Sequence, residues 1–598
     1  MDRELEKNLK EVLEQIKDWS VEEVDAAMLD PVAKMMLAAV LYETQKVRDS
    51  VDRLGERIAD RFCEDFIPRR NVSAMPAIAI LEPVLKGQKM EEGTFIDGNA
   101  SFSYRPSPTG KALTYIPVFQ TFILPVNEVY RLTPGRFHTP RMSKDVSVQK
   151  EQPNVMWIGL NSSVEVDCLQ GLSLLFRRTG GLSPVRISVG GGKRELAFAT
   201  MDRMEEIGMV EPFDAQQASG CSFSFLQEWK EALLDMREVS LVCLTDPVRD
   251  RDLFKARQYP SLFQFCLMSE DLDAIRDGTL WLKVEFPDGF RVPDDCDVVV
   301  NAFPVANVEV DQVVLTAANP IAKLQKQDEV FFLDVLKTSN QSRREGFDVE
   351  EDEYMIRDFD AVCYHDGDLY REVRNLYHHF VEDYYAFLDY HGIKDGEVIR
   401  QLRESFNRLG KSVGIQNAKY RFDSGVYAMR NLNRYPQPAS TKVSYMTTRG
   451  KAGNRPRAGE TMDNRKHPAL DAKVRVIVSA CCGRDKATAD ERYELLRYYA
   501  LTQDRLYTKM DIDAYLRKEI MAEFGASEFS RIFIKIFIGG MEGPQTLRRG
   551  LYVDIEFKDR KNYEKALAES FAPRMQQRIT DKSCLPMPVI VGLVNLEK

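Results

Sequence analysis

The sequence predicts an α+β protein of several domains. Long helices are expected at the N-terminus, followed by a β-rich middle, a helical block and a C-terminal ferredoxin-like domain. Three observations predict this class. Apolar residues step by three and four near the N-terminus, short apolar runs punctuated by Gly, Pro and Asn fill the middle, and the last segment has a βαββαβ pattern. At roughly 100–200 residues per domain, 598 residues correspond to about four domains.

Composition narrows the class of protein. Hydrophobic residues make up 44% of the chain and charged residues 29%, which suffices for a sizeable core and disfavours bulk disorder. The chain carries 82 basic and 92 acidic residues, a net charge of −10, which argues against nucleic acid as the main partner. One basic stretch, residues 442–466, is also rich in Gly, Pro, Ser and Thr. It is interpreted as a solvated loop, or else as a docking loop for an acidic partner.

The cellular location of the protein is predicted from the absence of targeting and membrane-spanning segments in the sequence. The N-terminus is charged and lacks the apolar stretch of a signal peptide, and no run of about 18 apolar residues is long enough to span a membrane. The ten cysteines are scattered and include no C-x-x-C pair; only Cys481 and Cys482 are adjacent. We therefore expect a cytoplasmic protein with reduced thiols and no zinc site.

Residues 1–70 are expected to form a helical region. Asp30 and Pro31 fit an N-cap followed by proline in the first turn, and a helix from there to Phe66 would be about 50 Å long. Its apolar residues follow a heptad seam, which is flanked by charged positions. Such a seam needs other helices to cover it, either from its own domain or from a partner. The candidate interface residues on this seam are Leu37, Val40, Val47, Val51, Leu54 and Ile58.

The rest of the chain divides by its pattern. Residues 75–340 alternate short β-like runs with turn residues and are expected to form one or two β-rich domains. Residues 365–415 show a helical apolar face, and residues 416–471 are expected to be rich in loops. Residues 472–598 give the ferredoxin-like domain, with strands at 474–478, 532–538, 551–557 and 589–594 and helices across 488–524 and 562–578.

Three motifs raise the question of catalysis, and each has a simpler interpretation. The run Gly190, Gly191, Gly192 and Lys193 is followed by Arg194 rather than Ser or Thr, so a hairpin turn is favoured over a phosphate loop. His378 and His379 precede Glu382 and Asp383 by one helical turn, but no third metal ligand completes the set. The acidic residues at 348–353 lack the glycine of a calcium loop. No catalytic, cofactor or metal residue is assigned, and an enzyme is not expected.

Several stretches resemble, in order along the chain, the TssF family of type VI secretion baseplate subunits. They are MPAIAIL at residues 75–81, EGTFI at 92–96, the segments at 119–121 and 124–126, and NAFPVAN at 301–307. The last is similar to the family's N-x-x-P-[VI]-x-N stretch. Pro304 inside an apolar run should mark an edge or a bulge, and Asn301 and Asn307 can satisfy the interrupted backbone.

The C-terminal segment resembles phage baseplate J-like wedge proteins, to which TssF is distantly similar. The matching pieces begin at Gly483-Arg484-Asp485 and at Arg505. Two threonines there have a direct physical interpretation: Thr488 with Glu491, and Thr508 with Asp511, each fit a capping box that opens a helix. These motifs are therefore predicted to be helix starts. The sequence departs from the proteobacterial pattern around residues 444–460, and the chain is most similar to a divergent, Bacteroidetes-like branch.

The resemblance implies a structural wedge subunit in the cytoplasm, in a baseplate docked at the inner-membrane complex. Implied partners are a TssG-like subunit, a second copy of the chain, TssK, TssE and the VgrG spike hub, and the implied role is to template assembly of sheath and tube. Two alternatives stay open. One is a wedge protein of a phage-tail-like or extracellular contractile particle, and the other is a metal-dependent enzyme centred on His378.

Overall fold

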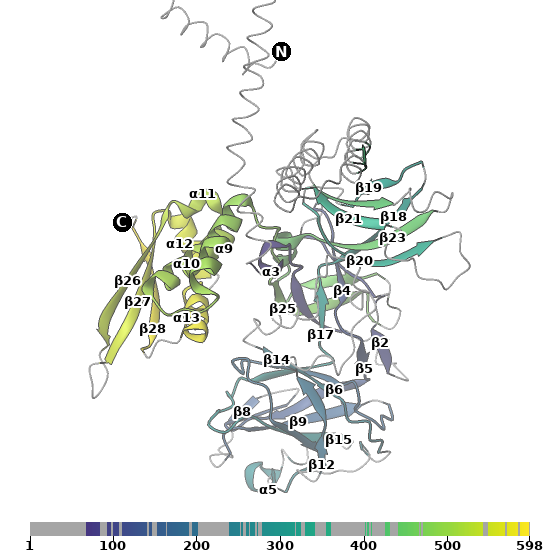
Figure 1. Ribbon diagram of the computed structural model, residues 1–598. Coiled ribbons are helices and arrows are strands. Elements are labelled where there is room, and N and C mark those ends of the chain that lie inside the picture. The colour runs from purple at the N-terminus through teal and green to yellow at the C-terminus, as the bar shows by residue number, and fades with distance from the viewer. Residues whose placement is uncertain are drawn as a thin grey trace, which may run out of the picture. The chain divides into compact units, whose positions relative to one another are not determined.

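Figure 1 shows the computed structural model of the chain. The structure describes residue 67, residues 69–340 and 425–596 with interruptions (the longest at 201–238), residues 354–359 and a few residues between 401 and 408. The chain divides into two compact units. The first takes residues 1–72, 359–424 and 487–598, and the second takes residues 73–358 and 425–486.

The second unit contains a closed six-stranded barrel, in which every strand has a neighbour on both sides. In spatial order its strands are β1 (Ile78–Glu82), β17 (Phe303–Ala306), β4 (Leu113–Pro117), β3 (Phe102–Tyr104), β24 (Thr461–Asn464) and β25 (Lys473–Cys481). Strand β1 is buried on both faces, which explains its unbroken apolar sequence. Ala79 and Leu81 lie in the barrel core with Phe102 and Phe303, whereas the alternate residues, such as Ile80, pack outside it.

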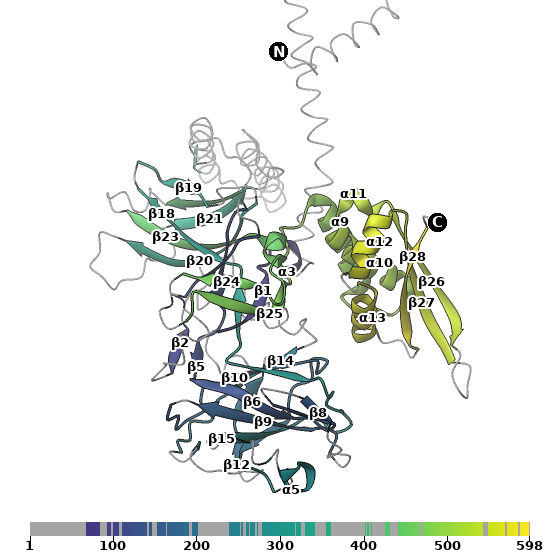
Figure 2. The ribbon, with the colours of Figure 1, turned by 180° about the vertical axis from the view of Figure 1, so that it is seen from behind.

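Two further sheets of this unit form a sandwich (Figure 2). The larger is β12 (Arg194–Leu196), β11 (Arg186–Val189), β15 (Thr279–Glu285), β9 (Val155–Ser162), β6 (Val126–Leu132), β7 (Arg136–His138) and β8 (Ser143–Asp145). The smaller is β13 (Phe198–Thr200), β14 (Val239–Leu244), β10 (Ser173–Arg177) and β16 (Asp297–Val300). Their facing side chains, such as Ile158 and Phe176, share one core. The outer face of the smaller sheet packs with β1 through Leu175 and Leu241, so barrel and sandwich are joined by apolar contacts.

The larger sheet also carries a small aromatic core on its outer face. The Phe263 ring, in the short helix α5 (Phe263–Cys266), lies 4.7 Å from the Trp281 ring and 5.7 Å from the Trp157 ring, both edge-on. A separate two-stranded ladder pairs β2 (Thr94–Ile96) with β5 (Thr121–Ile123). Strands are thus present from residue 78 on, within the region 75–340 that the sequence predicts to be β-rich.

The remaining strands of the second unit form two three-stranded sheets. One is β18 (Glu309–Leu315), β23 (Thr441–Thr448) and β20 (Phe331–Asn340), and the other is β19 (Ile321–Lys323), β22 (Gly425–Arg430) and β21 (Tyr354–Phe359). Residues 416–471, expected to be loop-rich, therefore contain β22, β23, the 3-10 helix η5 (Gly450–Asn454) and β24. Several of the Thr and Ser residues that indicated a loop lie in β23, whose partner strands come from elsewhere in the chain, for example with Glu309 opposite Thr447. The glycines Gly450 and Gly453 lie in η5.

The first unit packs helices on one face of a three-stranded sheet. The helices are α9 (Ala489–Thr502), α10 (Lys509–Phe524), α11 (Ala526–Phe529), α12 (Arg560–Ala568) and α13 (Phe571–Lys582), and α3 (Arg69–Val72) adjoins them. The sheet is β26 (Ile532–Met541), β27 (Arg548–Phe557) and β28 (Val589–Asn595), with β27 antiparallel to β26 and parallel to β28. Both predicted capping boxes are confirmed, at Thr488 with Glu491 and at Thr508 with Asp511.

The predicted ferredoxin-like domain is wrong in its first strand. The segment at 474–478 belongs to β25, which pairs with β1 and β24 in the barrel, so the C-terminal sheet has three strands rather than four. The reason is physical. Alternating apolar residues indicate a strand buried on one face, but they do not indicate which sheet it joins. One of the two partners of β25, strand β1, is some 400 residues away in the sequence.

The predicted α+β class is also wrong for the described part of the chain, because strands hold 46% of it and helices 20%. The helical N-terminal region 1–70, apart from Ile67 and α3, and the helical block 365–415, apart from single residues at 401–408, lie outside the described residues. So do the interface candidates Leu37, Val40, Val47, Val51, Leu54 and Ile58, and the residues His378 and His379.

Candidate functional site

Residues from three of the sequence motifs meet at one place in the second unit, which we call the motif junction and define as Ala77, Asn307, Gly453, Asn454 and Gly483. Asn307 is its centre and is 1% exposed. Its main-chain N–H donates to the Ala77 carbonyl (2.8 Å), its side-chain amide donates to the Thr114 carbonyl (2.9 Å), and its Oδ1 accepts from the Arg449 N–H (3.1 Å). The side chain of Asn307 therefore connects β4 to the start of η5, and its main chain connects the end of β17 to the residue before β1.

The two glycines allow the backbones of the motif junction to approach closely. A Cβ added at Gly483 would lie 2.5 Å from the Gly450 carbonyl oxygen, and one added at Gly453 would lie 2.8 Å from Asn307 Oδ1. Both would also come within 2.9 Å of the Ala77 Cβ. Asn454 holds Gly483 from both sides, donating to its carbonyl at 2.8 Å and accepting from its N–H at 2.9 Å. These positions need glycine because there is no space for a side chain.

The neighbouring motif residues complete the same joint. Met75 and Arg484 exchange two main-chain hydrogen bonds, at 2.8 and 2.9 Å, and the Asp485 carboxylate accepts from the Lys451 N–H at 2.8 Å. The stretches at 75–81, 301–307 and 483–485 are thus distant in sequence and adjacent in space. Their polar groups bond to main chain, so these motif residues stabilise the fold.

Asn301 performs the corresponding role toward the sandwich. Its backbone is left-handed, with φ of 61°, and its side chain is 3% exposed. Oδ1 accepts from the Leu124 N–H, while Nδ2 donates to the carbonyls of Leu124 and Val126. The prediction that both asparagines satisfy interrupted backbone is confirmed.

The position predicted for Pro304 is wrong. Strand β17 lies between β1 and β4 in a closed barrel, so Pro304 is not on an edge. The ladder with β4 begins at Val305, one residue later, and the Pro304 carbonyl instead accepts from the Val118 N–H at 3.0 Å. The register shifts lie in the next ladder, on either side of Ile80, the residue opposite Pro304.

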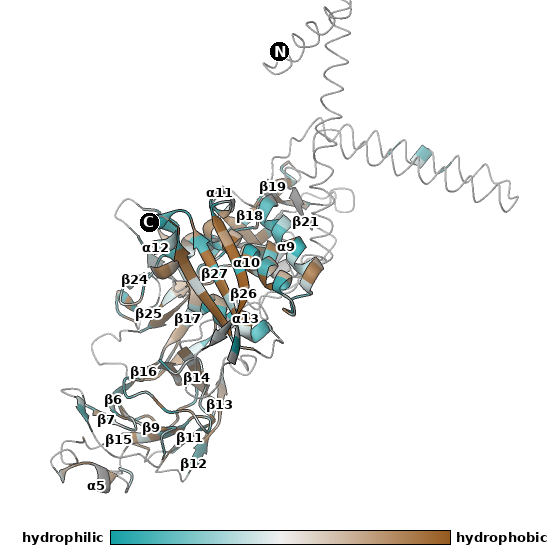
Figure 3. Cartoon of the chain, turned by 90° about the vertical axis from the view of Figure 1, so that its left-hand side faces the viewer, coloured by the Kyte–Doolittle hydropathy of each residue, from teal (hydrophilic) through white to brown (hydrophobic). Residues whose placement is uncertain are grey.

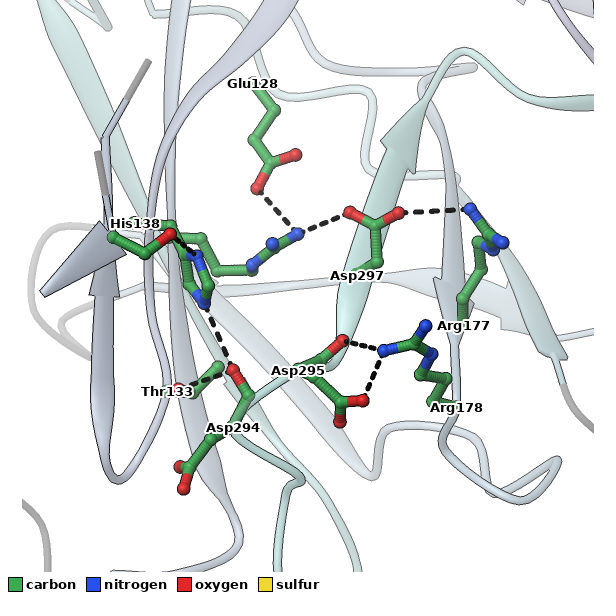
Figure 4. Close-up of polar contacts among 10 residues, drawn as sticks. Glu128, Thr133, His138, Arg177, Arg178, Asp294, Asp295 and Asp297 are labelled. Atoms are coloured by element: carbon green, nitrogen blue, oxygen red, sulfur yellow. Dashed lines mark hydrogen bonds and ion pairs between the residues drawn. The ribbon is translucent and has the colours of Figure 1, made fainter. Parts of the chain in front are cut away.

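A charge network links the two sheets of the sandwich (Figure 4). The Asp297 carboxylate, at the start of β16, lies 2.7 Å from Arg131 of β6 through one oxygen and 3.2 Å from Arg177 of β10 through the other. Arg131 also lies 3.4 Å from Glu128. Arg177 is the cross-strand neighbour of Asp297 in the smaller sheet, whereas Arg131 reaches it from the larger sheet. The network therefore fixes the position of one sheet against the other.

A bulge in β6 makes this arrangement possible. The register against β9 shifts between Glu128 and Tyr130, which inserts an extra residue and lets Glu128 and Arg131 meet although they are three residues apart. Burial raises the pKa of Glu128 to about 7, and Arg131 opposes that rise. Because the Glu128 side chain is 20% exposed, some water reaches the carboxyl group and moderates the cost of its charge.

His138 lies beside the network and is the one group there with a familiar catalytic pairing. Its Nδ1 lies 2.8 Å from the Ser143 hydroxyl, and its Nε2 lies 3.1 Å from the main-chain carbonyl of Asp294. Ser143 is the residue opposite His138 in the β7–β8 hairpin, so the pair follows from strand register. Burial lowers the pKa of His138 despite the hydrogen bond to Asp294. The second ring nitrogen meets a carbonyl rather than the carboxylate of a triad, which favours a structural role.

The other sequence candidates are also placed where the structure describes them. Strands β11 and β12, on either side of the glycine run, pair as a hairpin with Val189 opposite Arg194, as predicted, while residues 190–193 themselves lie outside the described residues. The basic stretch 442–466 lies largely in β23, η5 and β24. Within the described ranges, no cluster of His, Cys, Asp and Glu could hold a metal ion, and no helix could cross a membrane.

The first unit exposes the other face of its sheet. The helices cover Ile532, Val553 and Val591, whereas Phe533 and Phe537 are 38% and 44% exposed. We call this second surface the open sheet face; its members are Phe533, Lys535, Phe537, Tyr552, Asp554, Glu556, Ile590 and Val594. The Phe537 and Tyr552 rings stack at 5.5 Å, and Lys535 pairs with Glu556. Figure 3 shows how hydrophobic the residues of these strands are.

The sequence of β26 gives a sign of this exposed face that apolar periodicity alone does not reveal. Strand β26 is apolar at nearly every position, as a strand covered on both faces would be, yet among the described residues helices cover only one side. Exposed aromatic side chains on an uncovered sheet face, here beside the charged residues Lys535 and Asp554, are typical of an interaction surface.

No family model matches the chain, and no curated protein matches it. Among solved structures, the chain is similar to one in the TssK-TssF-TssG baseplate subcomplex of the type VI secretion system. That match has 11% identity and a TM-score of 0.40, and it covers 94% of this chain and 96% of the other.

A chain of the anti-feeding prophage baseplate matches with 8% identity, a TM-score of 0.28 and coverage of 98% and 70%. A chain of another type VI secretion baseplate complex matches with 12% identity, a TM-score of 0.32 and coverage of 98% and 93%. All three are baseplate assemblies. The assemblies that these matches come from include the type VI secretion baseplate, which the sequence motifs resemble, at low identity and low TM-score. At these values the function has to be argued from the residues of this chain.

Proposed function

We propose that the chain is a non-catalytic structural subunit of a contractile baseplate, a TssF-like wedge protein of a type VI secretion system. The observation that carries the proposal is where the motif residues lie in the folded chain. The residues that resemble the TssF family, at 75–81 and 301–307, and those that resemble the J-like wedge proteins, at 483–485, come together in one buried joint. A resemblance made of scattered short motifs gains weight when those motifs share one structural task.

The open sheet face supports the assembly role. It presents Phe533, Phe537 and Tyr552 on a surface that no described element covers. A subunit that functions within a larger complex is expected to expose such a surface before assembly. The charge network and His138 bond strands to one another, as is expected in a structural subunit.

The proposed partners are a TssG-like subunit and a second copy of the chain within one wedge, with TssK, TssE and the VgrG spike hub around it. The proposed location is the cytoplasm, at the inner-membrane complex. The apolar heptad seam that includes Val47 and Leu54 is proposed as part of the helical contact between subunits.

The test is co-expression of the tagged chain with the products of its neighbouring genes. The wild-type chain should capture a TssG-like protein, and the double variant Val47→Asp and Leu54→Asp should lose it because two charges would enter an apolar seam. A control variant replaces Arg48 and Asp52, on the predicted charged flank of the seam, with alanine and should keep the complex.

The outcomes separate the parts of the proposal. Capture of the TssG-like protein by both variants would reject the seam as the contact. Failure of the wild-type chain to capture any neighbour-encoded protein would reject the baseplate role itself.

A further inference from the structure

Strand β26 has an unusual sequence and one unpaired edge among the described residues. The run from Ile532 to Ile538 is Ile-Phe-Ile-Lys-Ile-Phe-Ile, which reads the same in both directions about Lys535. Strand β26 pairs with β27 on one side, and no described strand pairs with it on the other. A long apolar edge strand is a template for pairing with another chain. A palindromic one fits a second copy of itself, because antiparallel pairing about a two-fold axis brings like residues together.

The hydrogen bonds of the sheet show which backbone groups point outward. The Arg531 carbonyl accepts from the Lys558 N–H (3.1 Å), and the Leu551 N–H donates away from β26, to Pro588 (2.9 Å). Hydrogen-bonded pairs alternate along an antiparallel ladder. The main-chain groups of Phe533, Lys535 and Phe537 therefore face β27. Those of the four isoleucines, Ile532, Ile534, Ile536 and Ile538, face the free edge.

We propose that two copies of this chain join through their β26 strands, antiparallel about a two-fold axis at Lys535, into one continuous six-stranded sheet. In this register Ile532 lies opposite Ile538 of the second copy, and Ile534 lies opposite its Ile536. Each of these pairs uses outward main-chain groups on both strands, so the free edge is satisfied over its whole apolar length. Phe533 lies opposite Phe537, which places aromatic pairs on the open sheet face.

Other registers between the two β26 strands pair their main-chain groups or their side chains less well. A shift of one residue would set outward groups against inward ones and move each side chain to the wrong face. A shift of two would set Phe opposite Lys535 and lose the aromatic pairs. The proposed register does bring the two Lys535 side chains together, which is unfavourable by itself. Each is already paired with Glu556 of its own chain, which offsets this repulsion.

This inference deepens the proposed function, because it assigns a segment to the second copy within the assembly. It can be tested separately, since it concerns the full-length chain alone and makes no use of a TssG-like protein.

The test is site-specific disulfide formation in the purified full-length chain. Residues opposite each other in a non-hydrogen-bonded pair have Cα atoms roughly 4.5 Å apart, within disulfide range. The variant Lys535→Cys should therefore form a covalent dimer on mild oxidation, at least ten-fold above the background from the wild-type cysteines. Phe533→Cys alone should stay at background, because its counterpart lies four residues along the partner strand, about 13 Å away. An equimolar mixture of Phe533→Cys and Phe537→Cys chains should crosslink.

Two results would overturn the proposal. One is background crosslinking of Lys535→Cys in a chain that keeps the wild-type melting temperature. The other is crosslinking of Phe533→Cys alone that equals Lys535→Cys. If Lys535→Cys does not fold, the mixture of Phe533→Cys and Phe537→Cys decides in the same way, because both positions are partly exposed and tolerate substitution. Either failure would leave capture of a TssG-like protein, and thus the baseplate role, untouched.

Discussion

The side chain of Asn301 holds the backbone of Leu124 at both ends: Oδ1 accepts from the Leu124 N–H at 3.1 Å, and Nδ2 donates to the Leu124 carbonyl at 2.8 Å. Asn301 follows the last strand of the sandwich and precedes the barrel strand β17. Leu124 lies between β5 of the two-stranded ladder and β6 of the sandwich. The chain segment that leaves the sandwich at Asn301 is thus bonded by one buried amide to the segment that enters it at Leu124.

Two substitutions of Asn301 separate the contributions that its side-chain amide and its left-handed backbone make to stability. We expect Asn301→Ala to lower the free energy of unfolding by about 2–4 kcal/mol, because Leu124 would lose its partners in a buried site and alanine disfavours a left-handed backbone. Asn301→Gly should cost less, because glycine adopts the positive φ freely and only the amide is lost. Urea denaturation followed by tryptophan emission measures both, since Trp157 and Trp281 are buried in this unit. If the two variants lost the same free energy of unfolding, the left-handed backbone at residue 301 would make no contribution to the difference.

The close approach at Gly483 gives a second prediction. We expect Gly483→Ala to destabilise the second unit by about 1–3 kcal/mol, because its Cβ would overlap the Gly450 carbonyl and the strands cannot move independently. The matched control is Gly592→Ala on the open sheet face, where the nearest atom is the Asp554 carboxylate at 3.2 Å and can shift. Thermal melts of the two variants should differ, and a Gly483→Ala protein as stable as the control would refute the packing account of the motif junction.

Two buried carboxyl groups predict how stability depends on pH. Burial raises the pKa of both Glu128 and Asp334 to about 7. Each folded acid keeps its proton to higher pH than the unfolded acid, so its stabilising contribution is complete below about pH 4 and is lost as the pH rises through about 7. We expect the free energy of unfolding to fall between about pH 5 and pH 8.

Variants test that pH dependence directly. Glu128→Gln and Asp334→Asn should each reduce the decline of unfolding free energy with pH, and the double variant should reduce it most. Urea denaturation at a series of pH values gives the slope. An unchanged slope in the double variant would show that these carboxyl groups ionise normally in the folded protein.

The strand assignment of residues 474–478 is tested by a matched pair of substitutions. Val476 in β25 and Val553 in β27 are both fully buried, in separate cores. Val476→Asp should increase hydrogen exchange in β1 and β24 while α10 stays protected, and Val553→Asp should do the reverse. If Val476→Asp reduced protection from hydrogen exchange in α10, the result would contradict the assignment of β25 to the barrel and would favour a place in the C-terminal sheet.

Local features were predictable from the sequence. The capping boxes at Thr488 and Thr508 depend on residues three apart, and the β-rich character of residues 75–340 depends on short apolar runs. The roles of Asn301 and Asn307 followed from the need to satisfy a backbone interrupted by Pro304. In each case the determining contacts are close in sequence or are demanded by the backbone itself.

Pairing between distant segments was not predictable. Strand β25 carries no mark that distinguishes β1 from β27 as its partner, and the Ser and Thr residues of β23 resembled a loop until its partner strands were known. The charge network has the same origin. Arg131, Arg177 and Asp297 are far apart in the sequence, and only the facing of two sheets and a bulge at Glu128 bring them together.

The central claim is that the chain functions as part of a baseplate, and the mass of its natural complex tests this most directly. The chain alone is 68.5 kDa. After co-expression with its neighbouring genes, mass measurement of the captured material should show a discrete complex containing a TssG-like subunit and two copies of this chain. A single monodisperse species at the mass of one chain, with every neighbour present in the cell, would contradict the account.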